Sequence, residues 1–212
     1  MNVTEFSQEL DVIYENINKN GAPGLDEYEK SVILTHAQEL LVKETLKAEP
    51  DANRFPELVE TIDSTVTGMT GYDNGFVFKT PEGILKILNE KVIDDNGDEY
   101  TVLPISNEQF QTKRSKPYKY PPRRRAWRMG LGSSDIANVE IFGRPNKLLQ
   151  TYKARYVKKP EPIVLADIAP DSIDGISTIN ECKLDEGLHR DILKIAAGLA
   201  EQYYYDKYAT KE

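Results

Sequence analysis

The chain has 212 residues, a single cysteine and a formal net charge of −8 at pH 7. This length suits one sizeable domain or two small ones, and the lone Cys182 excludes an intrachain disulfide framework and a cysteine-rich zinc site. The N-terminus lacks the basic start and apolar core of a signal peptide, and no stretch approaches the roughly 18 consecutive apolar residues of a membrane span. The sequence therefore predicts a soluble protein, made in the cytoplasm, with no membrane partner.

Charge is distributed unevenly along the chain. Residues 1–110 carry 22 acidic and 8 basic side chains, residues 111–165 carry 3 and 14, and residues 166–212 carry 10 and 5. A basic block therefore lies between two acidic ends. Such asymmetry is typical of a protein with a partner of opposite charge, or of subunits that pack head to tail.

Two helices are predicted before residue 50. Apolar residues recur at helical spacing from Phe6 to Ile17, after Thr4 as the cap, and the Gly- and Pro-containing stretch at 20–24 ends this helix. The second helix starts at Asp26 and ends no later than Pro50. The side of the second helix that we expect to face the core carries Ile33, Ala37, Leu40, Leu41 and Glu44. A short helical turn is expected within residues 55–62.

The composition changes after Thr61 to glycine and β-forming residues. Residues 83–105 predict two strands joined at Asn96-Gly97, because both residues tolerate the positive φ of a hairpin turn. The capping-box pattern from Ser106 to Gln109 predicts a brief helix. Further strands are expected at Arg125–Met129, Ala137–Phe142 and Leu149–Val157. We interpret this centre as antiparallel β structure.

The chain is expected to leave the sheet at Pro160 and Pro162, and a helical period returns from Leu188 onward. We therefore predict an α+β protein with three parts. Residues 1–65 supply the N-terminal helices of a helical bundle. Residues 66–165 form an antiparallel β domain, sandwich or barrel-like, with a basic loop. Residues 166–212 form a linker and a C-terminal helix that returns to the bundle.

No pattern in the sequence selects a catalytic, cofactor-binding or metal-ligating residue. The run His189 to Asp191 mimics a kinase catalytic loop, but the chain lacks the glycine-rich loop and strand lysine that accompany it. The acidic run from Asp94 resembles a calcium loop, yet Glu99 occupies the place where glycine is required. We interpret this run as a solvated hairpin tip, residues 130–135 as a turn, and Cys182 as a small buried apolar group. No cofactor is expected, and an enzyme is the least favoured interpretation.

The stretch KRSKPYKYPPRRRAWR, residues 113–128, holds eight Lys or Arg residues, three prolines, three aromatic residues and no acid. It fits a nucleic-acid site in which arginines contact phosphates and aromatic rings stack on bases. It also fits a protein interface in which the arginines pair with carboxylates of a neighbouring subunit. The bland interpretation is an exposed loop that leads into a strand. We favour the interface, because the acidic partner surface is present in the same chain.

The candidate interface residues of this stretch are Lys113, Arg114, Lys116, Tyr118, Lys119, Tyr120, Arg123, Arg124, Arg125, Trp127 and Arg128. A second group lies near the end of the last helix. Tyr203, Tyr204 and Tyr205 are consecutive and cannot all share one helix face, so some of them must pack elsewhere or lie exposed. Because tyrosine and arginine often anchor protein contacts, we add these three to the candidate interface.

The order of segments resembles that of a known family. An early EYEKSVILTHAQELLVKE is followed by PPRRRAWRM, by LLQTYKARYVKKPEPIVL and by a closing ECKLDEGLHRDILKIAAGLAEQYY. The most telling parts are Y-x-A-R-Y-V-K-x-P-x-P-I at residues 152–163 and L-H-x-x-I-L-x-x-A-A-x-L-A at residues 188–200. Together these segments resemble the head-to-tail connector proteins, also called ring or adaptor proteins, of short-tailed bacteriophages, most closely those of crAss-like phages. The resemblance covers most of the chain.

This resemblance implies a structural component of the virion. Copies would form a closed ring, typically twelve-fold, stacked on the portal protein or on another ring around the channel through which genomic DNA leaves. Family members usually pair a helical bundle with a β-rich domain, and the resemblance transfers no catalytic or binding residue. A nucleic-acid-binding module that uses residues 113–128 is the alternative function.

Overall fold

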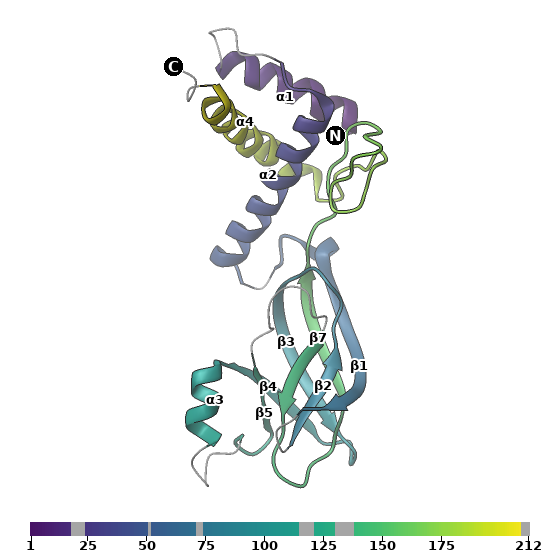
Figure 1. Cartoon of the computed structure of the whole chain (residues 1–212), viewed down its shortest axis with the longest axis vertical. Coiled ribbons are helices and arrows are strands. Elements are labelled where there is room, and N and C mark those ends of the chain that lie inside the picture. Colours follow the sequence, from purple (N-terminus) through teal and green to yellow (C-terminus); the bar gives the residue numbers. More distant parts are fainter. Residues whose placement is uncertain (18–23, 51, 71–73, 115–120, 130–137, 209–212) are drawn as a thin grey trace. The chain divides into compact units, whose positions relative to one another are not determined.

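The computed structural model describes the chain except residues 18–23, 51, 71–73, 115–120, 130–137 and 209–212. Contacts divide the chain into two compact units, one built from residues 1–58 and 159–212 and the other from residues 59–158. The first unit is helical and the second is a β-barrel (Figure 1). The predicted α+β class, with terminal helices and a barrel-like centre, is confirmed.

The helical unit contains α1 (Val3–Ile17), α2 (Glu27–Ala48), the 3-10 turn η1 (Pro56–Leu58) and α4 (Glu186–Tyr208). Both α1 and α2 pack against α4, the C-terminal helix. Small side chains make this close packing feasible, since Ala196, Ala197 and Ala200 of α4 are buried. The larger core side chains of these helices include Phe6, Leu10, Leu34, Ile192 and Leu193.

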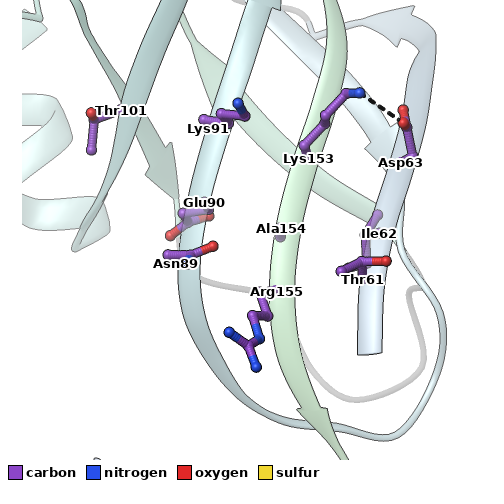
Figure 2. Close-up of a pocket in the computed structure, with 10 residues that line it drawn as sticks. All are labelled: Thr61, Ile62, Asp63, Asn89, Glu90, Lys91, Thr101, Lys153, Ala154 and Arg155. Carbon is purple, nitrogen blue, oxygen red and sulfur yellow. Dashed lines mark ion pairs between the residues drawn. The ribbon is translucent and has the colours of Figure 1, made fainter. Parts of the chain in front are cut away.

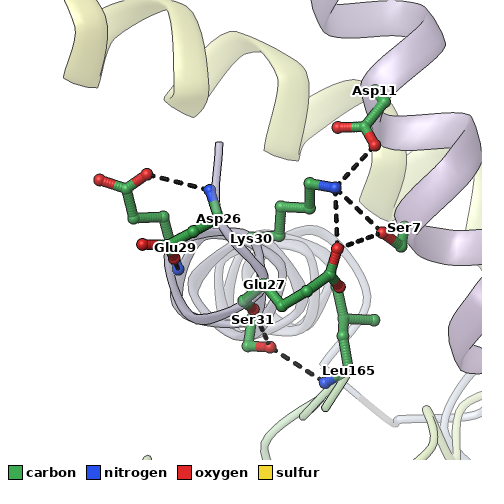
Figure 3. A network of polar contacts seen from close by, with 8 residues as sticks. All are labelled: Ser7, Asp11, Asp26, Glu27, Glu29, Lys30, Ser31 and Leu165. Atoms are coloured by element: carbon green, nitrogen blue, oxygen red, sulfur yellow. Dashed lines mark hydrogen bonds and ion pairs between the residues drawn. The ribbon is translucent and has the colours of Figure 1, made fainter. Parts of the chain in front are cut away.

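Polar contacts fix the start of α2 and join it to α1 (Figure 3). The second helix was predicted to start at Asp26, and Asp26 is its N-cap: the Asp26 carboxylate accepts a hydrogen bond from the Glu29 amide, and the Glu29 carboxylate accepts one from the Asp26 amide. Lys30 is buried, and its ammonium group donates to Asp11 of α1 at 2.6 Å and to Glu27 at 3.0 Å. The Ser7 hydroxyl of α1 joins the same network, since it donates to Glu27 at 2.9 Å and accepts from Lys30 at 3.0 Å, so both charged side chains of α2 link the two helices.

The segment between the barrel and α4 forms a small hairpin, residues 167–181, which we call the acidic hairpin. Asp174 and Gly175 form its turn with φ of 49° and 81°, the left-handed conformation that a two-residue type I′ turn requires. The flanking Ile173 and Ile176 exchange backbone hydrogen bonds of 2.9 Å. Asn180 pairs in the same way with Val164, at 3.0 Å in each direction.

The Cys182 thiol, which follows the acidic hairpin, is half-buried and donates a hydrogen bond to the Gln38 side chain at 3.2 Å. Burial raises its pKa to about 11, so the thiol stays protonated at neutral pH. The expectation of a purely apolar role for this cysteine was therefore incomplete.

The second unit is a closed barrel with the strand order β1-β2-β6-β5-β4-β3-β7, in which β7 pairs with β1. Helix α3 (Asn107–Arg114) lies beside β4 and β5 in Figure 1. The strands are β1 (Val59–Met69), β2 (Gly75–Lys79), β3 (Ile84–Asp94), β4 (Glu99–Ile105), β5 (Arg125–Met129), β6 (Asn138–Phe142) and β7 (Leu149–Lys158). The strands predicted at 125–129, 137–142 and 149–157 are confirmed as β5, β6 and β7, except that Ala137 lies outside the described residues.

Two features of the barrel differ from the sequence prediction. Strand β1 was not predicted, because Ile62 is its one buried residue and the strand therefore lacks an alternating apolar pattern. The pairing of β4 with β5 is parallel, whereas the other pairings in the barrel are antiparallel. A parallel pair needs a crossover connection, and the segment that carries α3 supplies it.

The barrel has two clusters of buried side chains. The larger fills the interior, with Phe78, Val92, Ile141 and Tyr152 among its members. The smaller cluster contains Ile105, Phe110, Trp127 and Phe142. Because Phe110 belongs to α3 and Trp127 to β5, this second cluster holds the helix against the barrel.

The acidic run at the β3–β4 turn is not a purely solvated tip, which corrects the sequence interpretation. The Asp94 carboxylate is buried and accepts hydrogen bonds from Lys147 at 2.9 Å and from the Tyr100 hydroxyl at 2.8 Å. The backbone amides of Asn96 and Asp98 also donate to it. One carboxylate thus closes the predicted Asn96-Gly97 hairpin from the inside.

Candidate functional site

The basic stretch lies partly outside the described residues. Lys116, Tyr118, Lys119 and Tyr120 fall in the range 115–120 that the structure does not describe, and the side chain of Arg114 is not described either. The same holds for the side chains of Tyr204 and Tyr205. These predicted interface residues remain predictions.

Arg123, Arg124 and Arg125 are exposed on a turn at the start of β5. Two backbone hydrogen bonds shape this turn: the Arg125 amide donates to the Pro122 carbonyl at 3.0 Å, and the Thr101 amide donates to the Arg124 carbonyl at 3.1 Å. Arg124 has a φ of 60°, which is uncommon for a residue with a side chain. The turn therefore holds three consecutive guanidinium groups at the barrel surface.

Trp127 and Arg128 are buried, which removes them from the predicted exposed surface. Trp127 packs under α3, and the Lys113 ammonium group lies 4.9 Å from the centre of its ring. Arg128 pairs with Glu90 inside the barrel, through Nε contacts of 3.0 and 2.8 Å to the two carboxylate oxygens. The Tyr152 hydroxyl donates to the same carboxylate at 2.9 Å. Strand alternation explains both positions, because neighbouring residues of β5 face opposite sides of the sheet.

Tyr203 is 42% exposed, and its hydroxyl lies 3.4 Å from the Glu29 carboxylate of α2. It belongs to the helical unit, whereas the three arginines belong to the barrel. The two predicted groups of interface residues thus lie on different units of the chain.

A hollow of about 670 Å³ lies in the outer face of the barrel across β1, β7, β3 and β4 (Figure 2). Strand register places its polar side chains in two rows. In the first row Asp63, Lys153, Lys91 and Thr101 follow one another across adjacent strands, and Thr101 is the register partner of Arg125.

The second row of the hollow consists of Thr61, Arg155 and Asn89. The exposed arginine turn is therefore continuous with the hollow through Thr101. The sequence could not reveal this, because the residues come from five strands whose pairing the sequence does not specify.

Charge in the hollow and its rim is positive on balance. Lys153 pairs with Asp63 at 2.9 Å, and Lys91 pairs with Glu99 at 2.6 Å. Among the residues that the structure describes, Arg155 and Arg125 have no carboxylate within ion-pair distance. Two cations are thus available for an anionic group from outside.

The described part of the chain offers little for metal or acid–base chemistry. It contains no group of three or more His, Cys, Asp or Glu side chains placed to hold a metal ion. His189 is buried in α4, and one of its ring nitrogens lies 2.9 Å from the Leu184 carbonyl. Over the same residues, no helix has the length and apolar character needed to cross a bilayer.

The fold and the charged barrel face define an α+β protein with a helical unit, a closed barrel and an exposed basic surface. The sequence profile of the family described as "Phage tail ring protein 3/4" matches residues 1–212. The chain therefore belongs to this family of bacteriophage tail ring proteins.

Two proteins of Bacteroides phage crAss001 are similar to this chain over most of their lengths. "Ring protein 4/5" is 35% identical over an alignment of 226 residues that covers 96% of this chain and 94% of that protein. "Ring protein 3" is 32% identical over 220 residues, which cover 92% of this chain and 93% of that protein. The resemblance on the segments of residues 27–44, 121–129, 148–165 and 181–204 is thereby confirmed at the level of the family.

Proposed function

We propose that this tail ring protein forms a closed ring of identical copies, twelve-fold in number, between the portal and the tail of the virion. The ring docks onto the portal protein or an adjacent ring and surrounds the channel through which genomic DNA passes without sequence-specific contacts. Membership of the tail ring family supports the ring. The observation that carries the docking role is the turn that exposes Arg123, Arg124 and Arg125 in a chain of net charge −8.

Charge separation suits such a ring. In a head-to-tail ring each copy presents one patch to a different patch of its neighbour, so a chain with a basic and an acidic surface can satisfy both around the cycle. An acidic remainder also suits a DNA channel, because a negative wall does not retain the passing phosphates. We assign no reaction to the protein.

Charge reversal at the arginine turn tests this function. In the variant Arg123→Glu, Arg124→Glu, Arg125→Glu, we expect a folded protein that no longer stacks on its neighbour ring or portal, because like charges then meet across the interface. The measurement is the mass of the purified protein, alone and mixed with the portal protein, with circular dichroism to verify folding. A triple variant of exposed basic residues elsewhere, R54E, K79E and R190E, is the matched control. Normal stacking by the arginine-turn variant would reject the docking role.

The alternative is nucleic-acid binding by the same basic stretch. Its predicted stacking residue Trp127 is buried under α3, which removes one of the three aromatic platforms. Tight and steeply salt-dependent binding of DNA by the isolated protein would promote this alternative. Weak binding that does not change in the triple arginine variant would leave the ring as the better function.

A further inference from the structure

We propose that the hollow on the outer face of the barrel is the docking site for the acidic hairpin of a second copy of this chain. The proposal rests on the proposed ring, because it names the two surfaces that meet between neighbouring copies. It adds Arg155, Lys91 and Lys153 to the interface, none of which was a candidate interface residue in the sequence.

The hollow is built to receive carboxylates. Arg155 lies on β7 between Thr61 of β1 and Asn89 of β3, its partners in register. A guanidinium flanked by a hydroxyl and an amide can hold a carboxylate at two points while its neighbours donate further hydrogen bonds. Because no described carboxylate pairs with it, Arg155 need not break an existing ion pair on docking.

Positive charge at the rim of the hollow strengthens its preference for carboxylates. Arg125 continues the first row of the hollow beyond Thr101, and the lysines Lys91 and Lys153 lie in the same row. Each lysine retains an acidic partner, Glu99 and Asp63 respectively. Glu90 also lines the hollow, but its carboxylate is paired with Arg128. The remaining four cations and two carboxylates give this surface a positive excess in an acidic chain.

The acidic hairpin supplies the complementary surface. Its sequence DIAPDSIDGISTINE carries four acidic residues and no basic one. Asp174 is paired with Lys159 at 2.6 Å, whereas the exposed side chains of Asp171 and Glu181 form no hydrogen bond or ion pair with the described residues. Ile179 is 58% exposed and adds an apolar contact beside these carboxylates.

The hairpin is also preorganised for docking. The paired amides and carbonyls of Ile173 and Ile176, together with the Ile168 amide that donates to the Ser177 carbonyl at 2.9 Å, fix its backbone. A segment that is ordered before it binds loses less conformational entropy on association. Its carboxylates can therefore dock without first folding the loop that carries them.

A nucleic acid is the less favoured occupant. The hollow keeps the carboxylates Asp63 and Glu99 on its surface, where they repel phosphates. None of the described residues that line the hollow is aromatic, so they offer no platform for base stacking. Charge complementarity within one chain favours a second copy instead.

Two variants, one in the hollow and one in the acidic hairpin, test the proposed contact from its two sides. The hollow variant is Arg155→Glu. Its new carboxylate lies between the uncharged residues Thr61 and Asn89, so it meets no like charge within its row of the barrel. The hairpin variant is Asp171→Lys with Glu181→Lys. We expect each to associate roughly tenfold or more weakly than the wild type in sedimentation velocity. The controls are Lys79→Glu and Glu44→Lys, which change exposed residues outside both surfaces.

Mixing the two variants distinguishes this contact from a general loss of charge. The intact hairpin of the hollow variant can dock into the intact hollow of the hairpin variant, and the exchanged charges attract at the other contact, so an equimolar mixture should associate where neither variant does alone. Combining all three substitutions in one chain should restore association, because the exchanged charges attract again. The proposal would be overturned if the hollow variant or the hairpin variant associated normally by itself, or if the mixture of the two did not associate.

A cross-linking measurement separates this contact from the ring itself. One chain carries Thr65→Cys, at an exposed position of β1 two residues beyond Asp63, and the other carries Ser172→Cys, both with Cys182→Ser. A short bismaleimide should link them into a dimer that Arg155→Glu abolishes. A monomeric wild type that still cross-links would reject the ring and keep the contact. An oligomeric wild type without this cross-link would keep the ring and reject the contact. DNA binding that Arg155→Glu abolishes while assembly persists would reassign the hollow to nucleic acid.

Discussion

Arg128 shows how the fold decides the role of one residue. It belongs to the most basic stretch of the sequence, yet it lies inside the barrel, where the Glu90 carboxylate pairs with it and the Tyr152 hydroxyl completes the network. Burial, followed by the adjacent Glu90 charge, raises the pKa of Tyr152, so its hydroxyl remains a donor across the physiological range. Both charged side chains of the pair are nearly inaccessible, so removing either one alone leaves an unpaired charge in the barrel interior.

We therefore expect Arg128→Met to lower the free energy of unfolding by about 3–5 kcal/mol. The double variant Arg128→Met with Glu90→Gln should recover part of this loss, because the glutamine is neutral and still accepts the Tyr152 hydrogen bond. Urea unfolding of the wild type, both single variants and the double variant measures the coupling. If the losses in unfolding free energy of the two single variants simply added up in the double variant, Arg128 and Glu90 would not act as a buried pair.

Asp94 gives a second residue-scale prediction, concerning pH. Burial opposes its ionisation, but hydrogen bonds from Lys147, Tyr100 and two backbone amides outweigh this and lower its pKa to about 2. The unfolded-state value is about 4, so the folded state binds the proton less tightly than the unfolded state. Its stabilising contribution is present above pH 4 and is lost as the pH falls toward 2.

We expect Asp94→Asn to lower the free energy of unfolding by about 2 kcal/mol at pH 7, because an amide cannot replace an anion that accepts several hydrogen bonds. The difference from the wild type should narrow steadily between pH 4 and pH 2. Chemical denaturation across this range measures it, with the exposed neighbour variant Asp95→Asn as the control. A difference that does not depend on pH would show that Asp94 acts by packing alone.

At the scale of elements, the link between α1 and α2 depends on Lys30. Burial opposes its charge, but hydrogen bonds and ion pairs with Asp11 and Glu27 outweigh this and raise its pKa. Lys30→Met keeps the apolar stem and removes the charge. Because the two carboxylates are partly exposed, we expect a loss of only about 1–2 kcal/mol in urea unfolding. Lys43→Met, which breaks an exposed pair with Glu39, should cost less than about 0.5 kcal/mol. Equal costs would show that burial adds nothing to the Lys30 contacts.

Local signals in the sequence predicted most elements but not all. The helical spacing of apolar residues in α1 and α4 and the Asn96-Gly97 turn between β3 and β4 are visible in the sequence, because periodicity and turn chemistry act within a few residues. Strand β1 has no such local signal. It forms because β2 and β7 pair with it, one on each side. The parallel pairing of β4 with β5 is likewise a property of the crossover and not of either strand.

At the scale of the whole molecule, the barrel is one continuous insertion in the helical unit. Its first and last strands pair, with Val59 opposite Val157, so its two ends lie one strand spacing apart. We expect residues 59–158 alone to fold cooperatively, since the closed barrel contains its own core. Near-ultraviolet circular dichroism and thermal unfolding of this segment measure it, with the whole chain as reference. A segment without a cooperative transition would show that the barrel depends on the helical unit.

Local sequence specifies the helices, the Asn96-Gly97 hairpin, the basic stretch and the segments that resemble phage connector rings, because each depends on residues close together in the chain. Which basic residues reach the surface, and which form ion pairs inside the barrel, depends on the fold. Arg128 turned inward and Arg155 joined the outer face because barrel closure fixes, through strand register, the side of the sheet on which each residue lies. Register is a relation between strands far apart in sequence, and no local pattern contains it.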